Sequence, residues 1–356
     1  MTNSVRLNTG LLIGNLHPTR TNCNVGCIDT SDYQTEFQKL LFLKDKGVLP
    51  DMMMDLSLVK HEYPLYLTIR DELGLPFGTV LSYQSFNKKD GLSWERSRAS
   101  FIKLCEDQLS FITIHFTADV DILQKAEQYR KIPMTSRGGG IVLYDSILKS
   151  RKQNIYREHI DEIIEIALKY DVVISLGTTF RPATILDACD WAHNEETQRQ
   201  LQVCKYLQKH GVKVIVENVG HIPLNKLEEH TKTLKAFNAP IMPLGPLPTD
   251  AAIGLDHISN AIGGAFASYL GIAHVINCVT RYEHSQSRIS ASATLEAIEV
   301  ANLAAHIADL SRDIPEAVLE DKLITEQRSL QRNCFASEES CTRCSFVCPL
   351  KIISND

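Results

Sequence analysis

The sequence lacks the excess of basic residues that is typical of nucleic-acid-binding proteins. Its 356 residues include 37 lysines and arginines against 43 aspartates and glutamates, which gives a net charge of −6. A nucleic-acid-binding surface normally needs clustered positive charge, so we expect no nucleic-acid partner. At this length, with 44% hydrophobic residues, the chain can bury a large core.

The sequence also lacks the features of an exported or membrane-spanning protein. Its first residues, M-T-N-S-V-R-L-N-T-G, contain no charged segment followed by an apolar one. The most apolar stretch, 251–279, is interrupted by polar and ionisable residues: Asp256, His257, Asn260 and His274. Ten cysteines without a secretion signal favour a reducing compartment, so we expect a cytoplasmic protein with no membrane partner.

Three of these cysteines stand close together near the end of the chain, in the string C-T-R-C-S-F-V-C-P. Cys341, Cys344 and Cys348 can bind three irons of a [4Fe–4S] cluster and leave the fourth iron open. An open iron can bind a small molecule, of which S-adenosylmethionine (SAM) is the best-known example. A structural zinc site would need a fourth ligand, and Cys334 can supply it. The tail alone favours the cluster and leaves zinc open.

Apolar, β-branched runs recur along the chain, and segments with helical periodicity lie between them. The runs predict strands at 11–16, 52–57, 78–83, 111–116, 172–177, 212–217, 240–245 and 273–279. Eight successive strand–helix units predict an α/β fold, a (β/α)8 barrel of the TIM type. A doubly wound open sheet is the alternative, because a sequence does not show whether a sheet closes.

The chain changes character after the eighth predicted strand. Residues 291–312 predict a long helix with an apolar stripe through Leu295, Ile298, Ala301, Leu303 and Ile307. Beyond it the sequence becomes charged and glutamine-rich, and then reaches the cysteines. We therefore expect a barrel domain, residues 1–312, and a mobile C-terminal arm, residues 313–356, that carries the cysteine motif as an iron–sulfur cluster-binding extension.

Polar or ionisable residues follow nearly all of the predicted strands, at the end of a barrel where active sites form. They are Asn15, Met54 with Asp55, Tyr83, His115, Arg181, Glu217 with His221, and His284. Ser136 and Arg137, followed by three glycines, suit an anion, and His221 and His284 can hold a divalent metal. Each feature alone also fits a cap, a surface residue or a flexible loop. Their convergence predicts one site.

Several strings of the sequence match one family when they are taken together and in order. They are M-D-L-S (54–57), P-F-G-T-V-x-x-Y-Q (76–84), T-I-H (113–115), T-S-R-G-G (135–139), S-L-G-x-x-x-R-P (175–182), E-x-x-G-H-x-P (217–223), L-G-P-L-x-T-D (244–250), G-x-D-H-I-x-x-x-I-G (254–263), V-T-x-x-E-H (279–284) and the terminal cysteines. As a set they resemble the phosphomethylpyrimidine synthase family, the radical SAM enzymes of thiamine pyrimidine synthesis. The resemblance runs over residues 10–348.

The resemblance implies a (β/α)8 barrel with a cluster-bearing extension, in a homodimer whose partners can exchange that extension. It implies substrate contacts from Asn15, Met54, Tyr83, His115, Ser136, Arg137, Gly138, Arg181 and Glu217. It further implies a divalent metal, zinc or iron, on His221 and His284, and a [4Fe–4S] cluster on Cys341, Cys344 and Cys348. It identifies no catalytic residue.

The implied reaction is that of a radical SAM lyase in thiamine biosynthesis. A 5′-deoxyadenosyl radical would start the rearrangement of aminoimidazole ribotide into hydroxymethylpyrimidine phosphate. The implied partners are the small-molecule ribotide and an electron donor such as a flavodoxin or ferredoxin.

The chain departs from the family pattern at four places. Its cysteine spacing is C-x2-C-x3-C where the family has C-x2-C-x4-C, and Thr178-Thr179 replaces an Asp-Gly pair. The family string Glu-Gly-Pro-Gly-His is E-N-V-G-H here (217–221), and Met242 replaces an aromatic residue. The extra N-terminal domain of the usual bacterial enzymes is absent, and residues 16–33 look like an insertion after strand one.

These departures leave three alternatives to the family reaction. A paralogue can make another product from aminoimidazole ribotide or an analogue, such as a hydroxybenzimidazole. A metal-dependent barrel lyase would use His221 and His284 and carry zinc in its tail. A non-catalytic iron–sulfur paralogue would hold a cluster without cleaving SAM.

Overall fold

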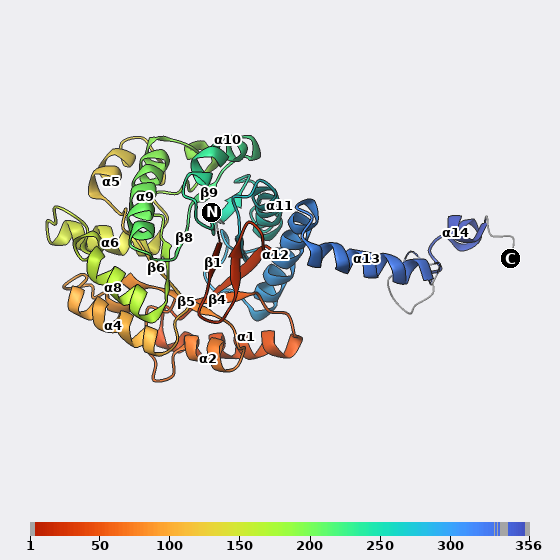
Figure 1. Ribbon diagram of the computed structural model, residues 1–356, viewed down its shortest axis with the longest axis horizontal. Coiled ribbons are helices and arrows are strands. Elements are labelled where there is room, and N and C mark those ends of the chain that lie inside the picture. The colour runs from red at the N-terminus through yellow and green to blue at the C-terminus, as the bar shows by residue number, and fades with distance from the viewer. Residues whose placement is uncertain (1–3, 331, 333, 335–340, 353–356) are drawn as a thin grey trace.

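The computed structural model describes residues 4–330, 332, 334 and 341–352 as a barrel with a helical extension (Figure 1). Seven parallel strands form one sheet in the order β11-β3-β4-β5-β6-β7-β8. Their bounds are β3 Arg20–Val25, β4 Met52–Asp55, β5 Phe77–Val80, β6 Phe111–Ile114, β7 Val173–Leu176, β8 Val214–Val216 and β11 Val275–Asn277. Sequential strands are neighbours throughout, as strand–helix repetition predicts.

Residues 240–242 fill the remaining place in the ring, between β8 and β11. Val216 forms a parallel bridge with Ile241, and its N–H donates to the Pro240 carbonyl at 2.9 Å. On the other side, the Ile241 carbonyl accepts a hydrogen bond from the His274 N–H at 2.8 Å. The sheet therefore closes, and the predicted barrel is confirmed over the open sheet.

Helices surround this sheet on its outer face (Figure 1). They are α1 Tyr33–Lys46, α2 Leu65–Asp71, α3 Leu81–Ser85, α4 Trp94–Glu106, α5 Val120–Ala126, α6 Arg137–Leu148, α7 Ile155–Glu158, α8 Ile160–Tyr170, α9 Trp191–Lys209, α10 Leu224–Lys235, α11 Asp256–Tyr269 and α12 Ala291–Ser311. Local sequence sets their ends: the Ser93 and Asp190 side chains cap α4 and α9, and Gly47 ends α1 with a φ of 66°.

The strands are buried on both faces, which explains why they read as continuous apolar runs. One core lies between the sheet and the helices and includes Phe101, Ile174 and Leu207. A second, smaller cluster includes Phe111 and Val173, whose neighbours along the same strands, Ile112 and Ile174, belong to the first core. Since successive side chains point to opposite faces of a strand, this second cluster fills the barrel interior.

A β-hairpin covers the N-terminal end of the barrel. It consists of β1 Ser4–Arg6 and β2 Leu12–Gly14, which pair antiparallel, and it adds Leu7 and Ile13 to the interior cluster. The Asn8 side chain donates to the Leu109 carbonyl, just before β6, at 2.9 Å. The prediction of a first barrel strand at 11–16 is therefore wrong. The first barrel strand is β3, inside the stretch interpreted as an insertion.

The buried face of α12 consists of small residues, chiefly Ala293, Ala297, Ala301, Ala304, Ala305 and Ala308. Leu303 and Ile307 are 58% and 49% exposed, so the predicted apolar stripe does not coincide with the buried face of α12. Alanine allows α12 to pack closely against α11 and the sheet, and this turns the larger residues outward.

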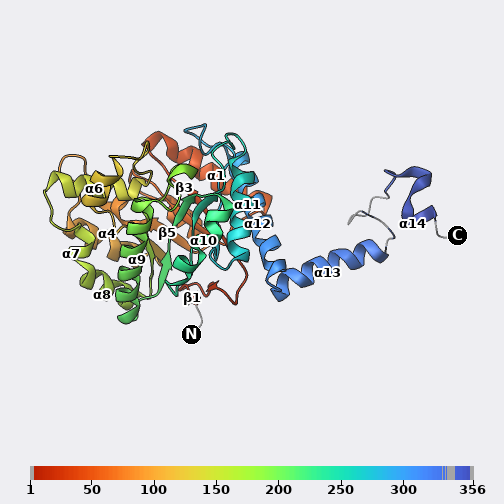
Figure 2. The same ribbon diagram turned by 90° about the horizontal axis from the view of Figure 1, so that it is seen from above.

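Beyond α12 the chain leaves the barrel as α13, Pro315–Leu330 (Figure 2). The described end of the tail contains a 3₁₀ turn, Ser345–Val347, and a short helix α14, Pro349–Ile352. Between residues 4 and 352, no helix in the described part of the chain is long and apolar enough to cross a membrane.

Replacement of Ile13 by alanine tests the role of the hairpin as a plug. Ile13 is fully buried in the barrel interior, so Ile13→Ala should lower the free energy of unfolding by about 2–5 kcal/mol. Leu12→Ala on the same strand is the control, because Leu12 is 38% exposed and should cost far less. Chemical denaturation measures both; equal losses would contradict the plug.

Candidate active site

The C-terminal ends of the first barrel strands bring Asn24, Met54 and Tyr83 to one edge of the barrel. The register of β3 and β4 places Asn24 beside Met54, and Met54 beside Gly78 on β5. Tyr83 follows β5 in α3. Met54 is buried in the barrel interior, whereas Asn24 is exposed. We call this C-terminal edge of the barrel the mouth.

Asn15 lies at the opposite end of the barrel, so its predicted place at the mouth is wrong. Its Oδ1 is 2.6 Å from Nε2 of His274, which directly precedes β11. Asn24, at the end of the true first strand, occupies the corresponding place at the mouth. The alternating string R-T-N-C-N-V was the available signal for this strand, but its inward residues are polar and do not form the expected apolar run.

His115 is buried at the mouth and closely enclosed by glycines. It follows β6, and its Nε2 lies 2.9 Å from the Ser136 hydroxyl, while its buried Nδ1 has no partner among the described residues. A Cβ added to Gly138 would lie 2.4 Å from the ring, and one added to Gly177 would lie 2.8 Å from it. Burial, with Arg181 nearby, lowers the pKa of His115 to about 3. The ring is therefore neutral at pH 7, with one nitrogen left for a ligand.

Arg181 and Glu217 place opposite charges at the ends of β7 and β8. The Glu217 Oε1 accepts hydrogen bonds from the hydroxyls of Thr113 at 2.7 Å and Ser175 at 3.1 Å. Burial raises the pKa of Glu217, and both the Thr113 bond and Arg181 oppose this rise. Burial lowers the pKa of Arg181, and Glu217 opposes that. Together they offer a polar ligand one acceptor and one forked donor.

The N-terminus of α6 carries the residues that the sequence predicts to bind an anion. Ser136 caps this helix by accepting a hydrogen bond from the Gly139 N–H at 3.1 Å. The Arg137 side chain is exposed, and its guanidinium carbon lies 5.5 Å from the centre of the Tyr83 ring. A helix N-terminus next to a free guanidinium favours a phosphate or carboxylate. The structure thus brings together the two elements of the predicted anion site.

His221 and His284 meet beside the mouth, as the metal prediction requires. Their ring centroids are 5.0 Å apart. Each Nδ1 contacts a carboxylate, Asp250 Oδ1 at 2.7 Å for His221 and Asp256 Oδ1 at 2.8 Å for His284. A carboxylate on Nδ1 leaves Nε2 as the metal-binding nitrogen. Burial lowers the pKa of His221, which favours the neutral form that binds metals.

The metal fit extends to these two histidines and their carboxylates only. Within the described residues there is no group of three or more histidine, cysteine, aspartate or glutamate side chains that could hold a metal ion. A metal here would therefore keep open coordination positions, as catalytic sites do.

Comparison with known proteins identifies the family of the chain. The model of the radical SAM ThiC family matches residues 1–333. The chain belongs to the radical SAM ThiC family. It is an enzyme of the radical SAM type, and the family implies SAM and an iron–sulfur cluster.

Curated relatives in this family are named phosphomethylpyrimidine synthase. The protein of Carboxydothermus hydrogenoformans is 34% identical over 85% of this chain and 74% of its own length. That of Thermotoga petrophila is 29% identical over 98% and 88%, and that of Desulforamulus reducens is 30% identical over 94% and 84%.

In this member of the ThiC family, Thr178 connects the mouth to the outer helix α9. The buried Glu196 on α9 accepts hydrogen bonds from the Thr178 hydroxyl at 2.8 Å, the Thr117 hydroxyl at 3.0 Å and the Thr179 and Phe180 N–H groups at 2.6 Å. The Thr178 hydroxyl is therefore bonded to Glu196. The Thr179 hydroxyl is buried without a partner among the described residues, where a Cβ on a neighbouring glycine of α6 would touch it.

The sequence E-N-V-G-H also changes the backbone between Glu217 and His221. Val219 has a φ of 74°, which is unusual for a β-branched residue. A proline ring fixes φ near −65°, so the proline of the ThiC family pattern could not adopt this conformation. The buried Asn218 supports it, because its Oδ1 accepts from the Val219 N–H at 2.6 Å. This part of the mouth differs from the pattern in shape as well as in sequence.

The cysteines of the ThiC-type tail are compatible with a cluster in their donor chemistry. Cys344 and Cys348 flank the 3₁₀ turn Ser345–Val347, and the Val347 N–H donates to the Cys344 carbonyl at 3.1 Å. Within the part of the chain that the structure describes, the three thiols are not gathered into a metal-binding group, so their role as cluster ligands stays a prediction. Cys341, Cys344 and Cys348 are free thiols, partly or largely exposed.

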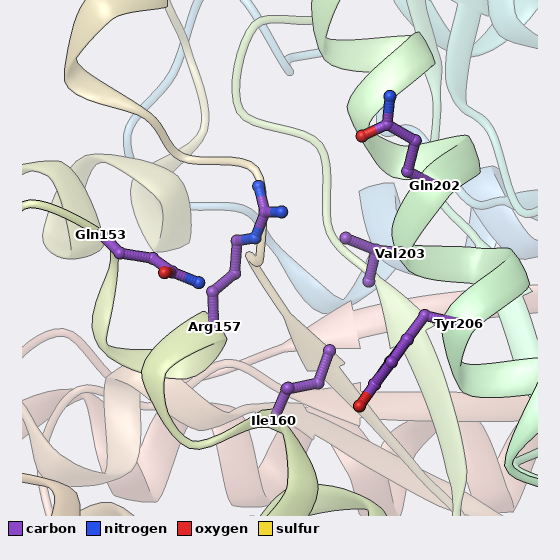
Figure 3. A pocket seen from close by; sticks show the side chains of 6 residues that line it. All are labelled: Gln153, Arg157, Ile160, Gln202, Val203 and Tyr206. Atoms are coloured by element: carbon purple, nitrogen blue, oxygen red, sulfur yellow. The ribbon is translucent and has the colours of Figure 1, made fainter.

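A surface groove lies away from the mouth, on the outer helical layer (Figure 3). Side chains from the α7–α8 region and α9 line it: Gln153, Arg157, Ile160, Gln202, Val203 and Tyr206. None of the residues of the predicted site contributes to it.

Replacement of Gly138 by alanine tests the enclosure of His115. The added Cβ would clash with the imidazole, so Gly138→Ala should destabilise the protein by about 1–3 kcal/mol. Gly140→Ala in the same helix is the control, because its Cβ would meet only Met134 at 3.6 Å and alanine favours helices. Thermal unfolding of both variants measures this, and an equally stable Gly138→Ala protein would contradict the geometry.

The low pKa of His115 predicts a pH dependence of stability. The folded protein keeps this ring neutral down to about pH 3, whereas the unfolded chain protonates it from about pH 6.5. The free energy of unfolding should therefore fall as pH decreases through this window, by up to about 1.4 kcal/mol per pH unit for this residue. His115→Asn should remove that part of the slope. Denaturation of the wild type and the variant between pH 7 and pH 4 tests the difference.

Proposed function

We propose that the chain is a phosphomethylpyrimidine synthase that converts aminoimidazole ribotide into hydroxymethylpyrimidine phosphate in thiamine biosynthesis. The names of the relatives support this proposal, and so does the convergence of the predicted contacts other than Asn15 at one mouth. The observation that carries most weight is the pairing of an anion site at α6 with a buried polar wall, His115 and Glu217. A phosphorylated imidazole needs both.

In this proposal each end of the ribotide has its own set of contacts. Ser136, Arg137 and Gly138 bind the phosphate at the N-terminus of α6, and Arg181 adds a second cationic contact. Met54 and Tyr83 supply apolar surface for the sugar and ring, and Asn24 takes the place assigned to Asn15. The Glu217 carboxylate accepts hydrogen bonds from ring or amino N–H groups, because its own oxygens are acceptors.

Cys341, Cys344 and Cys348 would hold a [4Fe–4S] cluster, and His221 and His284 a zinc or iron ion. When bound, the cluster supplies the electron that cleaves SAM into a radical. The task of the chain is then to fix the substrate and exclude water from the reaction. An electron donor such as a flavodoxin or ferredoxin would reduce the cluster, in the cytoplasm.

We also propose that residues 313–356 form an arm that serves the barrel of a second copy in a homodimer. Asp309, at the end of α12, accepts a hydrogen bond from the Thr19 N–H at the start of β3, so the arm departs from the end of the barrel opposite the mouth. The helix α13 then continues away from the barrel for about 24 Å. The exposed Leu303 and Ile307 on α12, and Ile258 and Ile262 on α11, supply apolar surface for the second copy.

A paralogue with a different product is the second candidate. It is favoured by the change at Thr178-Thr179 and by the changed backbone at Val219, both next to the substrate contacts. An unpaired polar group in a substrate pocket can shift specificity by orders of magnitude.

Anaerobic turnover tests the proposal. The protein is reconstituted with iron and sulfide, then incubated with SAM, a reductant and aminoimidazole ribotide, and the products are identified by mass spectrometry. Deoxyadenosine with hydroxymethylpyrimidine phosphate is the expected result. Deoxyadenosine with another product would establish the paralogue. An intact cluster without deoxyadenosine would contradict the family reaction, and the same result with alternative ribotides would contradict the paralogue as well.

Single cysteine variants test the cluster ligands. Cys341→Ala should abolish the cluster absorbance and the formation of deoxyadenosine, because three thiolates are needed. Cys334→Ala is the matched control and should retain both. Tightly bound zinc that is lost in both variants would instead favour the four-cysteine zinc site.

A further inference from the structure

The two metal-site histidines are held by carboxylates that belong to different parts of the fold. Asp250 lies in the loop after β10, Leu244–Leu247, and Asp256 begins α11. The side chain of Asp250 is 38% exposed, whereas that of Asp256 is 5% exposed. The sequence prediction included neither residue in the site.

We propose that Asp250 and Asp256 are positioning residues for the divalent metal, and that Asp250 also couples the metal site to the substrate loop that carries Arg181. This inference rests on the proposed metal site at His221 and His284.

The positioning role follows from the hydrogen bonds to Nδ1. A carboxylate acceptor keeps the proton on Nδ1, fixes the ring orientation and makes Nε2 a stronger donor to a metal. The two imidazole rings are in edge-to-face contact, and each Nδ1 is bonded to its own aspartate, at 2.7 and 2.8 Å. The two aspartates therefore orient both Nε2 atoms. Asp256 lies in the first turn of a 14-residue helix, where the helix dipole favours its negative charge.

The coupling role follows from the other contacts of Asp250 and His221. Both carboxylate oxygens of Asp250 accept from the Ile185 N–H, at 3.3 and 3.1 Å. The backbone N–H of His221 donates to the Pro182 carbonyl at 3.0 Å. The segment from Pro182 to Ile185 directly follows Arg181. One end of it is held by His221, the proposed metal ligand. The other end is held by Asp250, whose carboxylate also contacts His221.

Asp256 has no comparable link to this segment. Its Oδ1 contacts His284, and its buried Oδ2 has no partner among the residues that the structure describes. Both aspartates should therefore govern metal affinity, but only Asp250 should transmit metal binding to Arg181. Such coupling is reciprocal, so bound ribotide should also raise the affinity of the site for the metal.

Zinc affinity measures both roles without reference to turnover. The full-length protein, with its cluster reconstituted so that the tail thiols are occupied, is titrated with zinc against a chromophoric chelator. Each titration is run with and without aminoimidazole ribotide. Asp250→Asn and Asp256→Asn keep the side-chain shape and remove the charge, and His221→Ala removes a ligand. Glu162→Gln is the matched control, since Glu162 contacts Nδ1 of His159 at 2.9 Å on the outer helical layer.

We expect both aspartate variants to bind zinc about 10–100-fold more weakly, and Glu162→Gln to match the wild type. The ribotide should tighten zinc binding in the wild type and in Asp256→Asn, and should do so clearly less in Asp250→Asn, where the His221–Pro182 hydrogen bond remains as the other link. Aspartate variants that bind zinc as tightly as the wild type would overturn the positioning role. A ribotide effect of full size in Asp250→Asn, or none in the wild type, would overturn the coupling.

The failure of the underlying metal site has a separate signature. If His221→Ala binds zinc as tightly as the wild type, the metal lies elsewhere and the proposed site is wrong. Circular dichroism and thermal unfolding of each variant separate these results from loss of fold.

Discussion

Closure of the parallel sheet at Ile241 is the constraint on which the site depends. All the barrel strands run in the same direction, so every loop that follows a strand emerges at the same end. The short segment 240–242 joins β8 to β11 and brings the residues after these two strands next to each other. His221 and His284 are far apart in the sequence, yet their rings touch because the ring is closed. An open sheet would leave them on opposite edges.

Buried polar groups on α9 connect the loops of the mouth. Glu196 gathers the loops after β6 and β7, and Gln200 on the same helix donates to the Gly177 and Glu217 carbonyls at 3.1 and 3.0 Å. Burial raises the pKa of Glu196, and its hydrogen-bond donors oppose that rise. Such a network specifies one arrangement only when every member is satisfied. A change on α9 should therefore alter the mouth, although α9 itself lies outside the barrel.

The sequence alone was sufficient to predict the fold class. It also predicted the candidate site residues that lie within the motifs of the family. Apolar runs predicted six of the seven strands of the barrel sheet and the segment at Ile241 that closes it, because strands buried on both faces leave a strong signal. The first strand was missed because its inward positions are Asn22 and Asn24, whose side chains bond to each other at 2.9 Å. The apolar run of the hairpin was taken for that strand instead. The partners of the site residues were also missed. Asp250, Asp256 and Glu196 act on residues from other elements, and such contacts have no local pattern.

The hairpin plug has a consequence for the order of events in a catalytic cycle. Leu7 and Ile13 fill the N-terminal end of the barrel, and interior side chains such as Met52, Phe111 and Val173 pack in the same cluster. If the ribotide binds at the mouth as proposed, the substrate must enter and the product must leave by that same end. An arm that covered the mouth during the reaction would then have to withdraw between one turnover and the next.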